Sequence, residues 1–136
     1  MDLEHRGHKR RTEDFHPELS ASILNSAFRI HSVLGPGLLE SAYEGCLCHE
    51  LSEAGIAFRR QVPVPVRYRG FAIDCGFRLD IVVEEKAIVE VKSVDRLIPL
   101  HESQLFTYLR LSGGKLGLLL NFNTRHLRDG IRRLIL

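Results

Sequence analysis

Residues 78–92, RLDIVVEEKAIVEVK, constrain the fold more than any other part of the chain. Two mainly apolar runs flank Glu84, Glu85 and Lys86, and this pattern predicts two antiparallel strands joined by a tight turn. Charged residues nevertheless fall inside both runs, where the neighbouring residues indicate burial. The positions of these charges therefore bear directly on what the chain can do.

A three-residue turn defines the register of this predicted hairpin. It pairs Val83 with Ala87 and places Asp80 opposite Glu90, because directly opposite residues of an antiparallel pair point to the same face. A register shifted by one residue mixes charge and hydrocarbon on both faces, which disfavours it. The first register instead leaves one face entirely apolar, and this face consists of Leu79, Ile81, Val83, Ala87, Val89 and Val91.

The other face of the hairpin brings two carboxylates together. The Cβ atoms of Asp80 and Glu90 are expected to lie roughly 5 Å apart, with Lys92, opposite Arg78, on the same side. Like charges directly opposite each other destabilise a sheet unless a positive charge lies between them. Two interpretations fit this face: a solvent-exposed surface with balanced charges, or a site for Mg²⁺ or Mn²⁺, which prefer oxygen ligands. The hairpin alone does not decide between them.

The rest of the chain predicts one domain, residues 17–136, preceded by a flexible basic tail over residues 1–16. The chain has 136 residues, 44% of them hydrophobic, which suits a single domain with its own core. Helices are predicted over residues 17–34, 38–54 and 99–112, and strands over 58–69, 71–83, 87–94 and 115–121. After residue 123 the pattern fits a short helix or an edge strand. The order α-α-β-β-β-α-β predicts a mixed α/β sheet between helices.

The basic residues are mostly arginines and form three groups, although the net charge is only +2. Arginine suits bidentate contacts with phosphate, so three groups on one small domain indicate a polyanionic partner. No apolar run is long enough to span a membrane, and the N-terminus lacks a secretory signal, so we expect a cytoplasmic protein. The groups are residues 5–11, then Arg59, Arg60, Arg67 and Arg69, then Arg125, Arg128, Arg132 and Arg133.

Two predicted helices carry polar side chains that could join the carboxylate pair. Glu40 and Glu44 are four residues apart and therefore share one helix face. His101, Gln104 and Tyr108 line one face of the later helix. Taken singly, each set is ordinary helix surface.

The charged hairpin resembles the signature of the PD-(D/E)xK nuclease superfamily. Asp80 and the tripeptide Glu90-Val91-Lys92 match its D…(D/E)xK pattern on the expected strands, with Leu79 in place of the proline. The substitution of this proline is common in the superfamily.

Motifs in the flanking helices match the same superfamily. Gln104 and Tyr108 are similar to the QxxxY motif of its RecB-like branch, which also carries a glutamate on the preceding helix, here Glu40. Gly37, Glu40 and Tyr43 match the GxxExxY signature of a family of small, mostly prokaryotic proteins within the superfamily. The choice of Glu40 over the nearby second glutamate rests on this family pattern.

The resemblance, which extends over residues 19–122, implies a restriction-endonuclease-like α-β-β-β-α-β core with an extra N-terminal helix. It also implies hydrolysis of phosphodiester bonds in nucleic acid, DNA more readily than RNA, with Mg²⁺ as cofactor and Mn²⁺ as an alternative. The metal ligands that it implies are Asp80, Glu90, Glu40 and the backbone carbonyl of Val91.

The resemblance further assigns roles to the remaining polar residues. Lys92 would orient or help to deprotonate the attacking water, and Gln104 and Tyr108 would contact the phosphate or the surroundings of the metal. The arginines between residues 59 and 69 would contact the nucleic-acid backbone without reading its sequence. The alternative function is a catalytically silent module that binds nucleic acid or a protein partner. The sequence leaves the oligomeric state open, a homodimer included.

Overall fold

A computed structural model of the chain describes residues 16–136, so the tail predicted over residues 1–16 lies almost wholly outside the described residues. The helices are α3 (Pro17–Leu34), α4 (Glu40–Glu53) and α5 (Pro99–Ser112), together with a short 3-10 helix, η1 (Leu127–Gly130). The strands are β1 (Phe58–Pro63), β2 (Val66–Tyr68), β3 (Phe71–Ile73), β4 (Arg78–Val83), β5 (Ala87–Lys92), β6 (Leu116–Asn121) and β7 (Ile131–Ile135).

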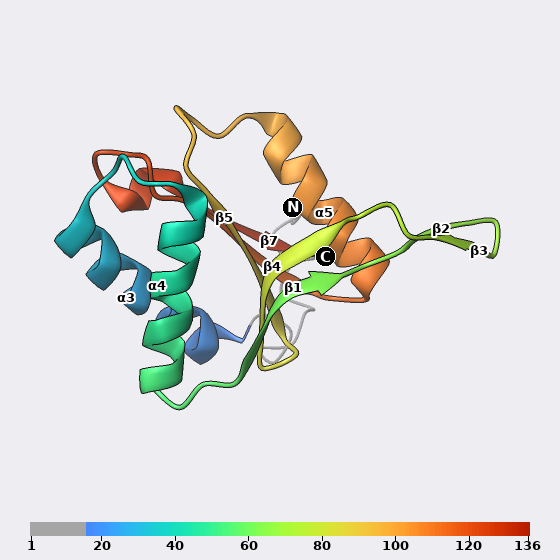
Figure 1. Cartoon of the computed structure of the whole chain (residues 1–136), viewed down its shortest axis with the longest axis horizontal. Coiled ribbons are helices and arrows are strands. Elements are labelled where there is room, and N and C mark those ends of the chain that lie inside the picture. Colours follow the sequence, from blue (N-terminus) through green and yellow to red (C-terminus); the bar gives the residue numbers. More distant parts are fainter. Residues whose placement is uncertain (1–15) are drawn as a thin grey trace, which may run out of the picture.

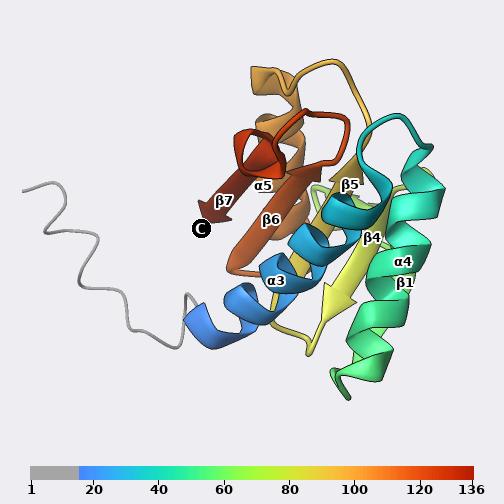
Figure 2. The same ribbon diagram turned by 90° about the vertical axis from the view of Figure 1, so that its left-hand side faces the viewer.

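These elements form layers, with a five-stranded sheet between helices (Figures 1 and 2). The strand order is β1-β4-β5-β6-β7, in which β5 and β6 are parallel and all other neighbours are antiparallel. Helices α3 and α4 cover one face of the sheet, and α5 covers the other. The arrangement is the predicted mixed α/β fold, including the extra helix before the core.

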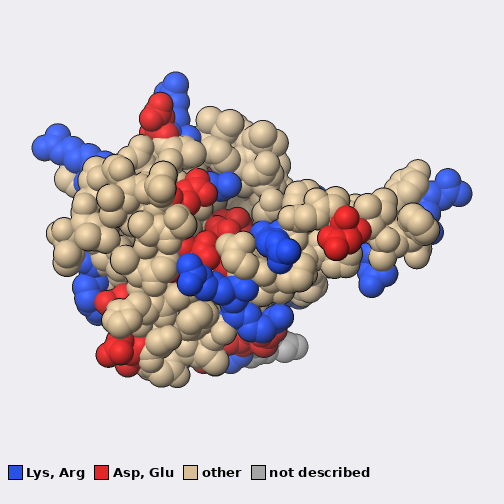
Figure 3. Space-filling view, viewed as in Figure 1, with Lys and Arg blue, Asp and Glu red and all other residues tan. Residues whose placement is uncertain are grey.

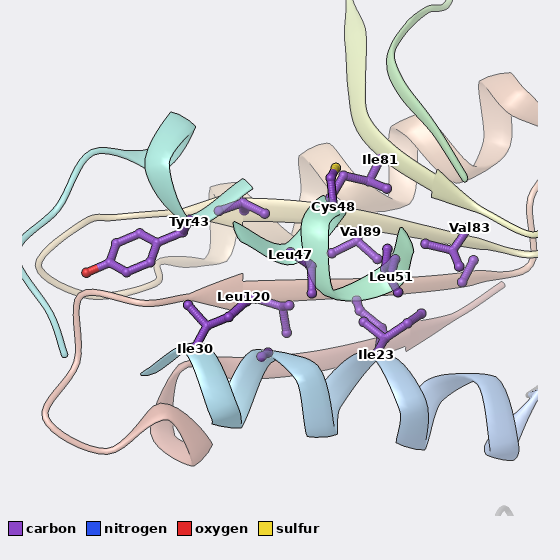
Figure 4. Packing of buried hydrophobic residues seen from close by; sticks show 14 of the residues in the cluster. Ile23, Ile30, Tyr43, Leu47, Cys48, Leu51, Ile81, Val83, Val89 and Leu120 are labelled. Atoms are coloured by element: carbon purple, nitrogen blue, oxygen red, sulfur yellow. The ribbon is translucent and has the colours of Figure 1, made fainter. Parts of the chain in front are cut away.

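Two apolar clusters hold the layers together. The larger cluster lies between the sheet and the helices α3 and α4, and it includes Ile23, Tyr43 and Val89 (Figure 4). The smaller cluster lies beneath α5 and includes Leu105 and Leu109. Strand β6 is buried along its whole length, as expected for an apolar strand that is covered on both faces.

The ends of the helices follow from local sequence. Pro17 and Pro99 lie at the starts of α3 and α5, where the N–H that proline lacks has no partner within the helix. The side chain of His101 accepts a hydrogen bond from the backbone N–H of Ile98 at 3.0 Å and so caps α5. Among the helices of residues 16–136, none combines the length and hydropathy that a membrane span needs.

The strands predicted over residues 58–69 and 71–83 are each broken in two. Pro63 and Pro65 end β1, because proline cannot donate to a strand ladder. Strands β2 and β3 consequently form a separate two-stranded sheet that projects from the domain (Figure 1). The C-terminal segment contains both structures that the sequence left open, first η1 and then the edge strand β7.

The register of β4 and β5 is the predicted one over the part of the hairpin next to the turn. Among the described residues, the backbone pairing of these strands stops at Ile81, so Arg78 is not paired with Lys92 as the regular register would require. The observed pairs are Val83 with Ala87, Val82 with Ile88 and Ile81 with Val89.

The alternation of side chains breaks at the same level in β4 and in its neighbour β1. Val62 pairs with Leu79, whereas Gln61 and Asp80 are left out of the register. As a result Ile81 lies in the cluster against α3 and α4, but Leu79 lies in the cluster beneath α5. The prediction that Leu79 shares the face of Ile81 is therefore wrong, because a strand distortion centred on Gln61 and Asp80 reverses the alternation.

Candidate active site

Asp80 and Glu90 lie together where β4 and β5 separate. The backbone N–H of Val91 donates to Oδ2 of Asp80 at 2.8 Å, and the N–H of Asp80 donates to Oε2 of Glu90 at 3.3 Å. Each carboxylate thus accepts a hydrogen bond from the backbone of the opposite strand. Side chains have replaced the backbone ladder at this point, and they hold the two carboxylates in one place.

The surroundings of the two carboxylates disfavour their charged forms. None of the ion pairs in residues 16–136 includes Asp80 or Glu90. Glu90 is only 6% exposed, and burial together with the charge of Asp80 raises its pKa to about 8. Burial also raises the pKa of Asp80, against the lowering effect of the hydrogen bond from Val91. A cation bound here would relieve this repulsion.

Lys92 lies at the end of β5, two residues beyond Glu90. Its positive charge opposes the rise in pKa of both Asp80 and Glu90, which places its ammonium group within electrostatic reach of the pair. The side chain is half-buried. Its backbone carbonyl accepts a hydrogen bond from Phe122 at 3.0 Å, so the chain after β6 fixes the end of β5.

Helix α4 brings two glutamates to the same part of the molecule. Glu40, the first residue of α4, accepts a hydrogen bond at 3.2 Å from the backbone N–H of Ser93, the residue after Lys92. The charges of Glu40 and Glu44 both act on Asp80 and favour its protonated form. All three carboxylates line one open cleft with a volume of about 530 Å³.

Glu44 differs from Glu40 in its surroundings. It is 6% exposed and pairs with Arg60, whose Nε lies 2.9 Å from its Oε2. The amide of Gln61 donates to both of its oxygens at 3.1 Å. Because Arg60 already pairs with the charge of Glu44 and Gln61 donates to its oxygens, Glu44 is the poorer metal ligand of the two. Glu40 is exposed, and within residues 16–136 only its Oε2 accepts a hydrogen bond, so Oε1 is left for a metal ion.

Gln61 is a residue of this cluster that the sequence analysis missed. It lies beside Asp80 in the paired strands β1 and β4 and has a positive φ of 51°. Its amide nitrogen lies 3.1 Å from Glu44 and 3.5 Å from Oδ1 of Asp80, so it bridges the two carboxylates. Extending the antiparallel register from β4 to β1 would have found it, but the sequence pattern does not define which residues of β1 pair with β4.

Tyr108 approaches the carboxylates from helix α5. Its ring meets the ring of Phe77 edge-on, with the centroids 5.4 Å apart. Burial, and then the charges of Glu90 and Asp80, raise the pKa of its hydroxyl. Gln104 lies one turn earlier on α5 and is half-buried. Its predicted contact with the phosphate or the metal surroundings stays a prediction.

The residues of the GxxExxY pattern position Glu40. Tyr43 is fully buried (Figure 4), and its hydroxyl accepts a hydrogen bond from the N–H of Leu38 at 3.1 Å and donates to the carbonyl of Gly35. Gly37 adopts a φ of 105°, which would strain any residue with a side chain. The loop before α4 is thereby held against the core, and Glu40 begins the helix at a defined place.

The arginines predicted to contact nucleic acid are spread over the surface. Arg60 lies beside the cleft, and Arg59 pairs with Glu85 in the β4–β5 turn at 2.7 Å. Arg67 and Arg69 are exposed on the projecting sheet. Figure 3 shows acidic side chains gathered near the middle of one face, with basic ones beside them and again along the projection.

The donor set fits a hard divalent cation. Carboxylate oxygens such as those of Asp80, Glu90 and Glu40 are the ligands that Mg²⁺ and Mn²⁺ prefer. Among residues 16–136, however, no three His, Cys, Asp or Glu side chains are gathered closely enough to coordinate one ion as they stand. Coordination therefore requires a shift of Glu40 or the participation of water, and Mg²⁺ usually keeps several water ligands.

A mixed sheet covered by helices on both faces, with its acidic cluster at the point where an antiparallel hairpin diverges, is the arrangement of restriction-endonuclease-like domains. The family model of the PD-(D/E)XK nuclease superfamily matches residues 17–134, and the chain belongs to this superfamily. Comparisons with curated proteins and with solved structures gave no match. The predicted superfamily and fold are thus confirmed, while membership of the narrower GxxExxY family stays a prediction. Proteins of this superfamily are generally nucleases that use divalent metal ions.

Proposed function

We propose that this chain is a nuclease that hydrolyses phosphodiester bonds of nucleic acid, with DNA as its first substrate and Mg²⁺, or Mn²⁺ in its place, as cofactor. The observation that carries the proposal is the pair formed by Asp80 and Glu90. Burial raises the pKa of both groups, and nearby negative charges add to the rise: that of Asp80 at Glu90, and those of Glu44 and Glu40 at Asp80. Neither group has an ion-pair partner in residues 16–136. Such an arrangement destabilises a fold unless a cation binds there.

Asp80, Glu90 and Glu40 would hold the cation, together with the backbone carbonyl of Val91. A bound Mg²⁺ supplies charge neutralisation at the phosphate and lowers the pKa of a water molecule. The hydrogen bonds from Val91 to Asp80 and from Ser93 to Glu40 already restrain two of these carboxylates. This restraint limits the rearrangement that binding requires.

Lys92 would hold the attacking water in line with the leaving oxygen and assist the removal of its proton, since its charge acts on both carboxylates. Tyr108 and Gln104 would contact the phosphate from the side of α5. The four arginines of residues 59–69 would contact the nucleic-acid backbone without reading its sequence. DNA as substrate, these residue roles and a cytoplasmic location are all part of the proposal.

A cleavage assay tests the proposal. Purified protein is incubated with single-stranded and double-stranded DNA and RNA in Mg²⁺, Mn²⁺ or EDTA. We expect cleavage only with a divalent cation and a loss of roughly 100-fold or more in Asp80→Ala and Lys92→Met. Lys86→Met is the matched control for the lysine, because Lys86 lies in the exposed turn of the same hairpin and should keep full activity. Metal-dependent cleavage that persists in Asp80→Ala contradicts the assignment.

The same experiment separates this function from the alternative of a catalytically silent module. Such a module would bind nucleic acid with a steep salt dependence but cut none of the four substrates with any metal. The Lys92→Met variant of such a module would also bind nucleic acid as tightly as the unaltered protein does. A homodimer would appear in sedimentation of the free protein.

A further inference from the structure

The sheet formed by β2 and β3 projects from the domain as an arm, defined here as residues 65–76 (Figure 1). A hydrogen bond from the N–H of Val64 to the carbonyl of Phe77, at 3.0 Å, closes its root. The arm pairs with none of the strands of the main sheet. Because an isolated two-stranded hairpin is only marginally stable in water, the arm contributes little to holding the domain together.

One face of the arm consists of four apolar side chains, three of them exposed. Tyr68 pairs with Phe71 and Val66 with Ile73, so these four side chains point to the same side. Tyr68 is 62% exposed and Phe71 is 69% exposed. Large rings gathered on a free surface mark a place where a partner binds.

The tip of the arm holds an arginine in a backbone conformation that disfavours it. Arg69 and Gly70 form the two-residue turn between β2 and β3, and both have a positive φ, of 51° and 82°. A turn with positive φ at both central positions prefers asparagine, aspartate or glycine at the first of them. Arg69 therefore carries backbone strain that asparagine would relieve, while it places a positive charge at the outer end of the arm.

The root of the arm adjoins the candidate active site. The ring of Phe77 meets that of Tyr108 with the centroids 5.4 Å apart, and the hydroxyl of Tyr108 lies within electrostatic reach of the carboxylate pair. At no more than about 3.3 Å per residue, the segment from Val64 to Tyr68, which ends in β2, extends at most roughly 13 Å from the root. A nucleic-acid strand with a phosphate at the carboxylates can therefore reach the aromatic rings within a few nucleotides.

We propose that the arm binds nucleic acid with unpaired bases beside the active site, with bases stacked on Tyr68 and Phe71 and a phosphate bound by Arg69. The inference rests on the proposed nuclease function and narrows its substrate class to single strands or duplexes with unpaired segments. Aromatic rings stack on any base, but only when that base is free of the duplex.

A second copy of the chain suits this face less well. A stable dimer buries about 800 Å² on each partner, and two aromatic side chains of about 150–250 Å² each fall well short of that area. Arg67 and Arg69 outnumber the one acidic residue of the arm, Asp74, so a second arm of the same charge does not complement the first. The charge of the arm and the small area of its apolar face therefore both favour nucleic acid over a second copy of the chain as the ligand.

The test is a binding measurement in EDTA, where cleavage does not interfere. Fluorescence anisotropy compares a labelled single-stranded DNA with the same sequence as a duplex. Tyr68→Ser should weaken single-strand binding roughly tenfold and leave duplex binding unchanged, whereas Tyr68→Phe keeps the ring and should bind as the unaltered protein does. The thermal midpoint should stay the same in both variants, because the ring contacts little of the domain.

The substitution Arg69→Asn tests the contribution of the positive charge at the tip of the arm without changing the backbone conformation of the turn. Asparagine suits the turn, so the arm stays formed, but the slope of log affinity against log salt on single strands should become shallower by about 0.7. Arg110→Gln is the matched control, since Arg110 is exposed on α5 and should leave this slope unchanged.

The outcomes distinguish this inference from the nuclease proposal. Binding of single strands through Tyr68 and Arg69 without cleavage in any metal refutes the nuclease function and leaves the arm in place. Suppose instead that the unaltered protein cleaves nucleic acid, and that Tyr68→Ser and Phe71→Ser bind and cleave it equally well. The proposed role of the arm is then refuted, and the nuclease function stands. A preference for duplex, or arm variants that change the sedimentation of the free protein instead of its affinity for DNA, also refutes it.

Discussion

Replacing Glu90 by glutamine should stabilise the metal-free protein and at the same time abolish its activity. Glu90 is 6% exposed, and burial followed by the charge of Asp80 raises its pKa from 4.5 to about 8. Between these two pH values the folded protein holds a proton that the unfolded chain releases. The stability that this proton provides is full below pH 4.5 and is lost as the pH rises through about 8.

The size of the effect follows from the same pKa. A rise from 4.5 to about 8 is equivalent to about 5 kcal/mol. Relaxation of the surrounding side chains and water that enters the cleft reduce this cost, so we expect Glu90→Gln to add about 2–3 kcal/mol to the free energy of unfolding at pH 9. Glutamine keeps an oxygen that can accept the N–H of Asp80, which limits other losses.

Urea unfolding in EDTA at pH 5 and at pH 9 measures this difference. The unaltered protein should lose stability between the two pH values, and Glu90→Gln should lose much less. Glu53→Gln, an exposed position at the end of α4, is the control and should follow the unaltered protein. Saturating Mg²⁺ should stabilise the unaltered protein at pH 9 but not Glu90→Gln. If Glu90→Gln is less stable than the unaltered protein at pH 9 in EDTA, the charge of Glu90 does not destabilise the fold, and the reasoning is refuted.

Two further substitutions test how the fold supports the site. Tyr43→Phe keeps the buried ring but removes the hydroxyl bond to Leu38, so it should lower the free energy of unfolding by about 1 kcal/mol in a thermal melt. It should also reduce cleavage by displacing Glu40, and added Mg²⁺ should restore part of that loss; full activity would contradict the positioning role. Gly130→Ala places a Cβ 2.3 Å from the carbonyl oxygen of Asn121, so it should destabilise the fold by about 3 kcal/mol or more. Gly45→Ala serves as the steric control, because a Cβ there meets only Nη2 of Arg60 at 3.8 Å, an ordinary contact. An unchanged melting temperature for Gly130→Ala would show that η1 can move away from β6.

The hairpin register was predictable from sequence, but its distortion was not. Only one pairing, Val83 with Ala87, leaves a face free of charge, and the structure has that pairing. The reversal at Leu79 depends on side chains that bind the backbone of a neighbouring strand. The alternation of apolar and polar residues does not predict such bonds, because a register derived from it treats every residue of the strand as part of the backbone hydrogen-bond ladder.

The surroundings of the helical glutamates were likewise beyond the sequence. Glu40 and Glu44 share one face of α4, and their spacing cannot distinguish them. The difference arises because Arg60 and Gln61, from strand β1, bind Glu44. Which residues of β1 face α4 depends on the tertiary packing of that strand. The end of β1, in contrast, could have been read from the prolines at positions 63 and 65.

The separation of β4 and β5 also determines what remains when a carboxylate is lost. Two adjacent antiparallel strands tend to continue their backbone hydrogen bonds along their whole length. Asp80 prevents this, because its side chain accepts the hydrogen bond from the N–H of Val91 that a backbone carbonyl of β4 would otherwise accept. Without this side chain the ladder can extend past Ile81 and fill the space between the strands. Removal of Asp80 would then close the cavity as well as delete a ligand, and a higher concentration of metal would not restore it.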